Sequence, residues 1–174
     1  MPDRTRFWSP LPDWPQAMLA GRDMRIAAVP LGSVLQLSGD TSAWLADHGV
    51  AASLGPRDRC TGSRYALRLA PDSVLLVSEK SLPATAGWQW DGCAISDLSD
   101  GILAFDIGGP DAATLMARGS EYPFESKAVL PQESARLLFA GLKVIVAQRP
   151  QGWRLHIERH WAPALWRWLQ AHLQ

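Results

Sequence analysis

The sequence repeats one order of predicted elements, and this repeat constrains the fold more than any other feature. An apolar strand ending in glycine is followed by a short helix, a second glycine, a polar loop and a strand hairpin, and the series then starts again. Gly39 and Gly109 close the two strands, and Gly49 and Gly119 close the two helices, 70 residues apart in each case. Each copy must bury the apolar face of its strands under helices. The sequence therefore predicts an α+β fold of two similar strand–helix–hairpin halves with mainly antiparallel sheet.

The first copy has clear turn and cap signals. Asp40 or Thr41 can accept a backbone N–H group at the start of a helix, and Gly49 suits the left-handed position after it. Pro71 and Asp72 favour a type I turn between two strands. The strands of this copy are predicted at 26–30, 33–39, 65–70 and 73–79.

The second copy follows the same plan. Pro110 suits the first position of a helix that ends at Gly119, and Ala112, Leu115 and Met116 fall on one side of that helix. The strands of this copy are predicted at 94–98, 101–107, 135–140, 142–148 and 152–158.

A last helix is predicted at about 160–172. Trp166 lies about 140° around the helix from Trp161, away from the apolar stripe, which makes Trp166 a candidate contact for another protein. Packing under a neighbouring loop is the alternative. The predicted core stripe consists of Trp161, Leu165, Trp168, Leu169 and His172.

The offset of 70 residues, continued without a gap, also places the hairpin residues Leu67 and Val74 on Leu137 and Val144. We expect the two halves to pack as one compact body. The predicted divisions are an extended N-terminal arm at 1–24, a first half at 25–93 and a second half at 94–174.

Tryptophan is unusually frequent, with nine residues in the chain. A single small core cannot easily enclose so many indole side chains. Trp is enriched at protein interfaces because it joins a large apolar area to a polar N–H. The arm is rich in proline, which interrupts helix and strand hydrogen bonding, so its aromatic side chains should lie on this domain or on another subunit. An extended segment around Gln89 would place its two indoles on one face. The candidate partner-interface residues are Phe7, Trp8, Trp14, Trp88, Trp90 and Trp166.

Charge and hydropathy exclude several classes of partner. Lys and Arg number 17, and Asp and Glu also number 17, which leaves no excess positive charge for a phosphate backbone. No apolar run approaches the roughly 18 residues of a membrane span, and no signal peptide pattern opens the chain. We therefore expect a cytoplasmic protein that binds neither nucleic acid nor membrane. Cys60 and Cys93 fit no metal or disulfide spacing and are predicted to be buried.

The residues show no specific catalytic, cofactor-binding or metal-ligating pattern. Gly108 and Gly109 lack the remaining parts of a nucleotide-binding motif and suit a helix cap. Asp106 is the one suspicious carboxylate because it interrupts an apolar strand, although a place on the solvent face would also explain it. His156 alternates with Leu155 and Ile157, which predicts that it faces water.

Several segments together resemble a known family. They are DLSDGILAFDIGGPDAATLMARG, a Leu-Pro segment before SARLLFAGLKVIV, WRLHIERHWAPALWRWLQAHL and the hairpin YALRLAPDSVLLVSE, about 110 of 174 residues. Their order is similar to that of the gamma subunit of heterotetrameric sarcosine oxidase. A more distant similarity is to the folate-binding fold of the glycine-cleavage T-protein, an aminomethyltransferase.

This resemblance implies a noncatalytic subunit that supports assembly of a flavin-dependent, amine-demethylating oxidase or dehydrogenase. The larger flavoprotein subunits would hold FAD, FMN, NAD and tetrahydrofolate, whereas this chain would hold none of them. Two alternatives stay open: a folate-binding protein that acts on its own, or a stand-alone interaction module.

Overall fold

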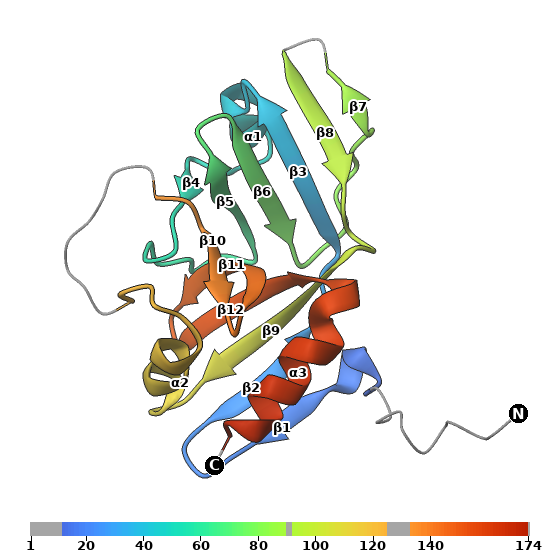
Figure 1. Ribbon diagram of the computed structural model, residues 1–174. Helices are drawn as coiled ribbons and strands as arrows, with labels where there is room; N and C mark the ends of the chain where they lie inside the picture. The colour runs from blue at the N-terminus through green and yellow to red at the C-terminus, as the bar shows by residue number, and fades with distance from the viewer. Residues whose placement is uncertain (1–11, 90–91, 125–132, 174) are drawn as a thin grey trace, which may run out of the picture.

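The computed structural model describes residues 12–89, 92–124 and 133–173. Within these residues, strands outnumber helices (Figure 1). The strands are β1 (Met18–Ala20), β2 (Arg25–Val29), β3 (Ser33–Gly39), β4 (Ser53–Leu54), β5 (Arg64–Ala70), β6 (Ser73–Ser78), β7 (Gly87–Trp88), β8 (Cys93–Asp97), β9 (Ile102–Gly108), β10 (Arg136–Phe139), β11 (Leu142–Arg149) and β12 (Gly152–Glu158). The helices are α1 (Ser42–Asp47), α2 (Ala112–Gly119) and α3 (Ala162–Ala171), with short 3-10 helices η2 (Trp14–Gln16) and η3 (Arg159–Trp161).

The strands form two six-stranded sheets. Sheet A has the order β1-β2-β9-β12-β11-β10, and sheet B has the order β4-β5-β6-β3-β8-β7. Every pair of neighbouring strands is antiparallel except β4 and β5. The predicted α+β class is confirmed, and the helices and long strands lie within a few residues of their predicted bounds.

The two sheets exchange one strand each. Strand β2 comes from the first half of the sequence and pairs with β9 in sheet A. Strand β8 opens the second half and pairs with β3 in sheet B. The boundary between 93 and 94 therefore does not separate two sheets, because the short links β2–β3 and β8–β9 each cross from one sheet to the other.

The repeat is present in the structure, but the hairpins of the two copies do not correspond as the constant offset of 70 residues predicted. Read outward from β3 and β9, the two sheet orders match strand by strand, so that β5 and β6 correspond to β11 and β12. The gapless offset instead placed β5 and β6 on β10 and β11, which is wrong. The second copy has a longer connection between its helix and its hairpin, and that extra length moves the hairpin along the chain.

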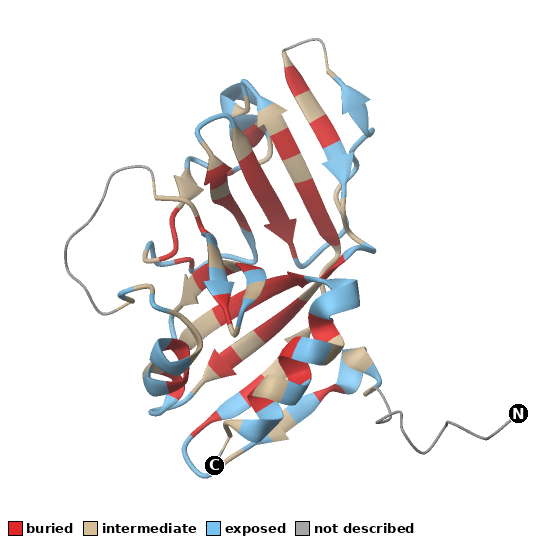
Figure 2. Ribbon diagram, viewed as in Figure 1, coloured by how far each residue is buried: buried red, intermediate tan, exposed pale blue. Residues whose placement is uncertain are grey.

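Each sheet has one face under helices and one face toward the other sheet (Figures 1 and 2). Helices α2 and α3 cover the outer face of sheet A, where Phe105, Leu115 and Leu165 are fully buried. Helix α1 covers the outer face of sheet B. A third apolar cluster joins the inner faces of the two sheets. These contacts explain why buried residues occur on both faces of the central strands.

The buried face of α3 differs from the predicted stripe. Trp166 is buried at 5% exposure, whereas Trp161 is 47% exposed. Trp161 belongs to the preceding 3-10 helix, so it does not continue the helical face, and the core side of α3 is rotated toward Ala162 and Trp166. The expectation that Trp166 lies off the core is wrong. No helix among the described residues has the length and apolarity to cross a bilayer.

Candidate functional site

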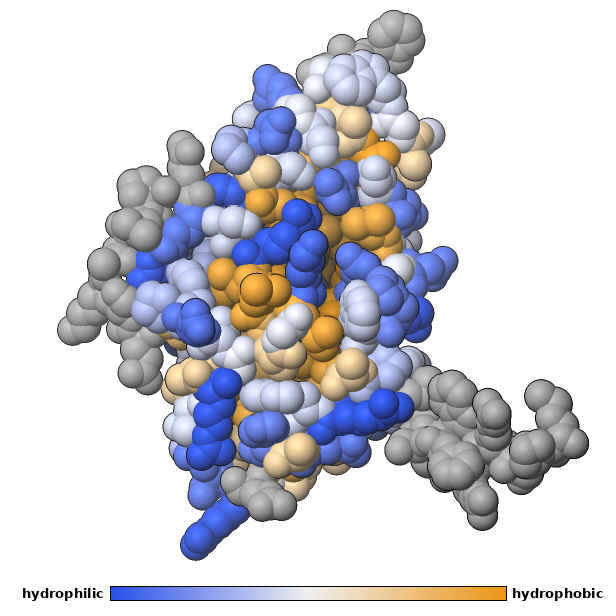
Figure 3. Space-filling model, in the orientation of Figure 1, coloured by the Kyte–Doolittle hydropathy of each residue, from blue (hydrophilic) through white to orange (hydrophobic). Residues whose placement is uncertain are grey.

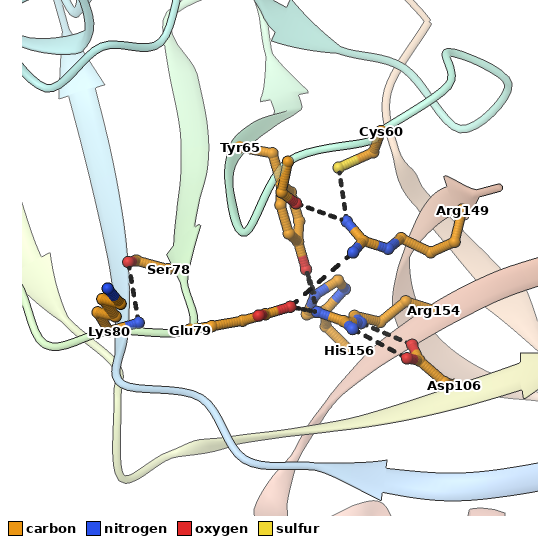
Figure 4. Close-up of polar contacts among 10 residues, drawn as sticks. Cys60, Tyr65, Ser78, Glu79, Lys80, Asp106, Arg149, Arg154 and His156 are labelled. Carbon is orange, nitrogen blue, oxygen red and sulfur yellow. Dashed lines mark hydrogen bonds and ion pairs between the residues drawn. The ribbon is translucent and has the colours of Figure 1, made fainter.

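A polar cluster lies where the inner faces of the two sheets meet (Figure 4). Tyr65 reaches it from β5, and Arg154 and His156 reach it from β12. Alternation places Arg154 and His156 on the same face of their strand, and sheet B covers that face. Their side chains are almost fully buried, at 3% and 0% exposure.

Tyr65 and His156 form a directed pair across the sheets. The Nδ1 atom of His156 lies 3.0 Å from the carbonyl oxygen of Ile145, and a carbonyl only accepts, so Nδ1 carries the hydrogen. The Nε2 atom then accepts from the hydroxyl of Tyr65 at 2.8 Å. Burial lowers the pKa of His156 to about 4, and burial raises the pKa of Tyr65 to about 12. Both groups are therefore neutral near pH 7.

Arg154 connects the same pair to two carboxylates. Its guanidinium donates to both carboxylate oxygens of Asp106, at 2.6 and 2.9 Å, the fork geometry of a strong ion pair. A third donor lies 3.2 Å from Glu79, at the end of β6 in the other sheet. The suspicious carboxylate Asp106 thus neutralises a buried arginine.

Cys60 and Arg149 complete the cluster. The guanidinium of Arg149 lies 3.2 Å from the sulfur of Cys60 and also donates to the carbonyl of Gly62. It lies over the ring of Tyr65, 5.5 Å from the ring centre. Burial raises the pKa of the Cys60 thiol, which disfavours the reactive thiolate. The predicted burial of Cys60 is confirmed.

The polar side chains of the cluster join the two sheets by hydrogen bonds to one another. Among the described residues, no buried side-chain nitrogen or oxygen lacks a hydrogen-bond partner. No group of three or more metal-ligating side chains occurs within those residues either. Chemically, the arrangement holds neutral Tyr65 and His156 and paired charges in fixed positions across the contact between the sheets.

Two cavities flank this contact, one over the uncovered inner face of each sheet. The first, of about 730 Å³, is bounded by the 20–30 segment, the end of β9 and the β11–β12 turn, and Arg149 and Asp106 reach it. The second, of about 520 Å³, lies between the inner face of sheet B and the strands β10, β11 and β12 of sheet A, and it reaches His156. Both volumes fall in the range of small-molecule pockets.

The predicted interface residues are scattered. Trp14 and Trp166 pack edge to face, 5.9 Å apart, and Trp14 also contacts Phe105. Trp166 therefore belongs to the core of this chain, and the half-buried Trp14 packs against that core. Trp88 is 75% exposed on the edge strand β7. Phe7, Trp8 and Trp90 lie outside the described residues.

The described part of the predicted arm lies on this domain. Ala17 is buried in the sheet A core, and β1 pairs with β2. Sequence reasoning missed Tyr65, Glu79 and Arg154 as members of one cluster. The available signal was a charged residue within each of two apolar strands, Asp106 and Arg154. That the two residues face each other follows only from the pairing of β9 with β12.

Comparison with solved structures finds chains of similar fold. A chain in the structure of heterotetrameric sarcosine oxidase from Corynebacterium sp. U-96, in complex with pyrrole 2-carboxylate, aligns at a TM-score of 0.71 and 20% identity. The alignment covers 89% of this chain and 86% of that chain. The two chains share one fold.

The similarity to this sarcosine oxidase extends through both sheets, since it covers most of each chain, and the two chains are of nearly equal length. The suspected resemblance to a sarcosine oxidase subunit is confirmed at the level of the fold. No protein-family model and no curated protein matches the chain.

Proposed function

We propose that the chain is a noncatalytic, gamma-type subunit of a flavin-dependent amine-demethylating oxidase or dehydrogenase, and that it supports assembly of the catalytic subunits. The observation that carries the proposal is the end-to-end fold similarity to a chain of a heterotetrameric sarcosine oxidase. A similarity that covers most of both chains favours the role of a whole subunit over that of an embedded module.

The polar cluster supports the same proposal. Arg154, His156 and Tyr65 are buried and hydrogen-bonded to one another or to neighbouring groups. Such a cluster stabilises a rigid body that a larger subunit can bind. FAD, FMN, NAD and tetrahydrofolate would then be held by the partner subunits.

Purification from the native cells tests the assembly role. A tagged full-length chain should co-purify with larger subunits in fixed stoichiometry, with flavin absorbance and with oxidation of an N-methyl amine. Recovery of the chain alone, from cells in which the flavoprotein subunits are present, would overturn the proposal.

Calorimetry with tetrahydrofolate tests the stand-alone alternative. The proposal expects no heat of binding to the isolated chain. Micromolar binding at 1:1 stoichiometry would show that the chain itself binds folate, and the scaffold role would have to be dropped.

A further inference from the structure

Each cavity is lined by one residue at the same position of the repeat, Asp106 in the first cavity and Gln36 in the second. In sheet A, Asp106 of the central strand lies opposite Arg154. At the equivalent place in sheet B, Gln36 lies opposite Leu75. The ion pair that fills the sheet A position is thus replaced by a neutral amide and an apolar side chain in sheet B.

The sheet B cavity therefore combines apolar side chains with a few polar ones and lacks the ion pair of the sheet A position. Apolar side chains from both sheets provide six of its thirteen lining residues, and Figure 3 shows hydrophobic surface in the middle of one face, with hydrophilic side chains lying across it. His156 closes one end, but both of its ring nitrogens are engaged, so it offers a ligand no hydrogen bond. The apolar lining consists of Leu69, Leu75, Leu98, Ile102, Val144 and Ile145.

Two cations lie at the mouth of this cavity. Arg136 and Lys143 are exposed and contribute to the lining. Within the described part of the chain, neither side chain forms a hydrogen bond or an ion pair. Glu158 also lines the cavity, but its carboxylate lies 3.5 Å from His160 and is exposed. The mouth therefore carries a net positive charge at neutral pH.

We propose that this cavity binds a small organic anion, a carboxylate carried on an apolar body. The apolar body would replace water against Leu69, Leu75 and Ile145, and the carboxylate would pair with Arg136 and Lys143 at the entrance. Small-molecule sites usually combine apolar lining with polar groups that fix the orientation of the ligand. Binding at this cavity would not depend on assembly with other subunits.

Octanoate and octylammonium provide matched probes, because they share an apolar body and differ in charge. With the full-length chain labelled with ¹⁵N, octanoate below its micelle-forming concentration should cause saturable shifts of the amides of Leu75, Lys143 and Ile145. Octylammonium should bind at least ten-fold more weakly. Equal binding of the two probes, or octanoate shifts confined to the sheet A cavity, would overturn the proposal.

Variants at the mouth test the role of the two cations. Because both residues are exposed, the double substitution Arg136→Gln with Lys143→Gln should leave the thermal midpoint unchanged. The double substitution should lower the affinity for octanoate at least ten-fold, and the chain should then bind octanoate and octylammonium equally well. The control, Lys80→Gln with Arg167→Gln, removes two exposed cations outside both cavities and should leave octanoate binding unchanged. Wild-type affinity in the mouth variant would contradict the proposed site.

Discussion

Tyr65 and His156 lie on different sheets, and the hydroxyl of Tyr65 is the hydrogen-bond partner of the Nε2 atom of His156. Tyr65→Phe deletes the hydroxyl that donates to Nε2 of a fully buried imidazole. An unsatisfied buried acceptor costs about 1–3 kcal/mol, and we expect this loss in the free energy of unfolding measured with urea. Tyr122→Phe serves as the control, because the hydroxyl of Tyr122 contacts Glu133 at a partly exposed position. A loss at Tyr65 no larger than that at Tyr122 would contradict the assigned pairing.

The buried imidazole also makes stability depend on pH. The pKa of His156 is lowered from 6.5 to about 4 in the folded chain, so the unfolded chain binds more protons between these values. The contribution of the neutral His156 to the free energy of unfolding is fully present above about pH 6.5. It is lost as the pH falls toward 4, which lowers the free energy of unfolding by about 3 kcal/mol. Urea unfolding across this range should show it. His156→Gln should flatten the slope whatever its stability at pH 7, and an unchanged slope would exclude His156 as the cause.

Truncation of two tryptophans should change the stability of the isolated chain by very different amounts. Trp166→Ala removes a core side chain in contact with Phe105 and Trp14, and we expect a loss of about 3–5 kcal/mol in unfolding free energy. Trp88 is 75% exposed, so Trp88→Ala should change the stability of the isolated chain by less than about 0.5 kcal/mol. If Trp88 contacts a partner, the same change will weaken assembly. A large stability loss at Trp88 would place it in the core instead.

At the scale of elements, the turn from β9 into α2 depends on a glycine. Gly109 has φ +111°, and a Cβ atom there would collide with the carbonyl oxygen of Asp23. Gly49, after α1, has φ +74° with open space around it. Gly49→Ala should cost about 1 kcal/mol from backbone strain alone, whereas Gly109→Ala should cost about 2–4 kcal/mol. Chemical denaturation of both variants tests the difference, and equal costs would show that the collision relaxes freely.

Local patterns predicted elements well and predicted their partners poorly. The turn at Pro71 and Asp72 correctly marked the β5–β6 hairpin, and the buried face of α2 matched its apolar spacing. The pairing of β2 with β9 depends on contacts between distant residues, which no local pattern encodes. For the same reason His156 was wrongly predicted to face water. Alternation assumes one solvent face, whereas β12 has the helix-covered core of sheet A on one side and sheet B on the other.

At the scale of the whole molecule, the exchanged strands make the two halves dependent on each other. A fragment of residues 1–91 lacks β8, and a fragment of residues 92–174 lacks β1 and β2. Each would leave a central strand unpaired on one side. We expect neither fragment to unfold cooperatively alone, and we expect a 1:1 mixture to recover the circular dichroism spectrum of the intact chain. Cooperative unfolding of either fragment alone would contradict this dependence.

The exchange also sets an order for folding during synthesis. Sheet B needs no residue beyond Asp97, but β2 must wait for β9, and sheet A is incomplete until β12 has left the ribosome. Pairing between distant segments is slow, and unpaired strand edges favour aggregation. The β1–β2 hairpin is therefore synthesised first but joins its sheet late. The nascent chain is then most prone to aggregate while its second half is being translated.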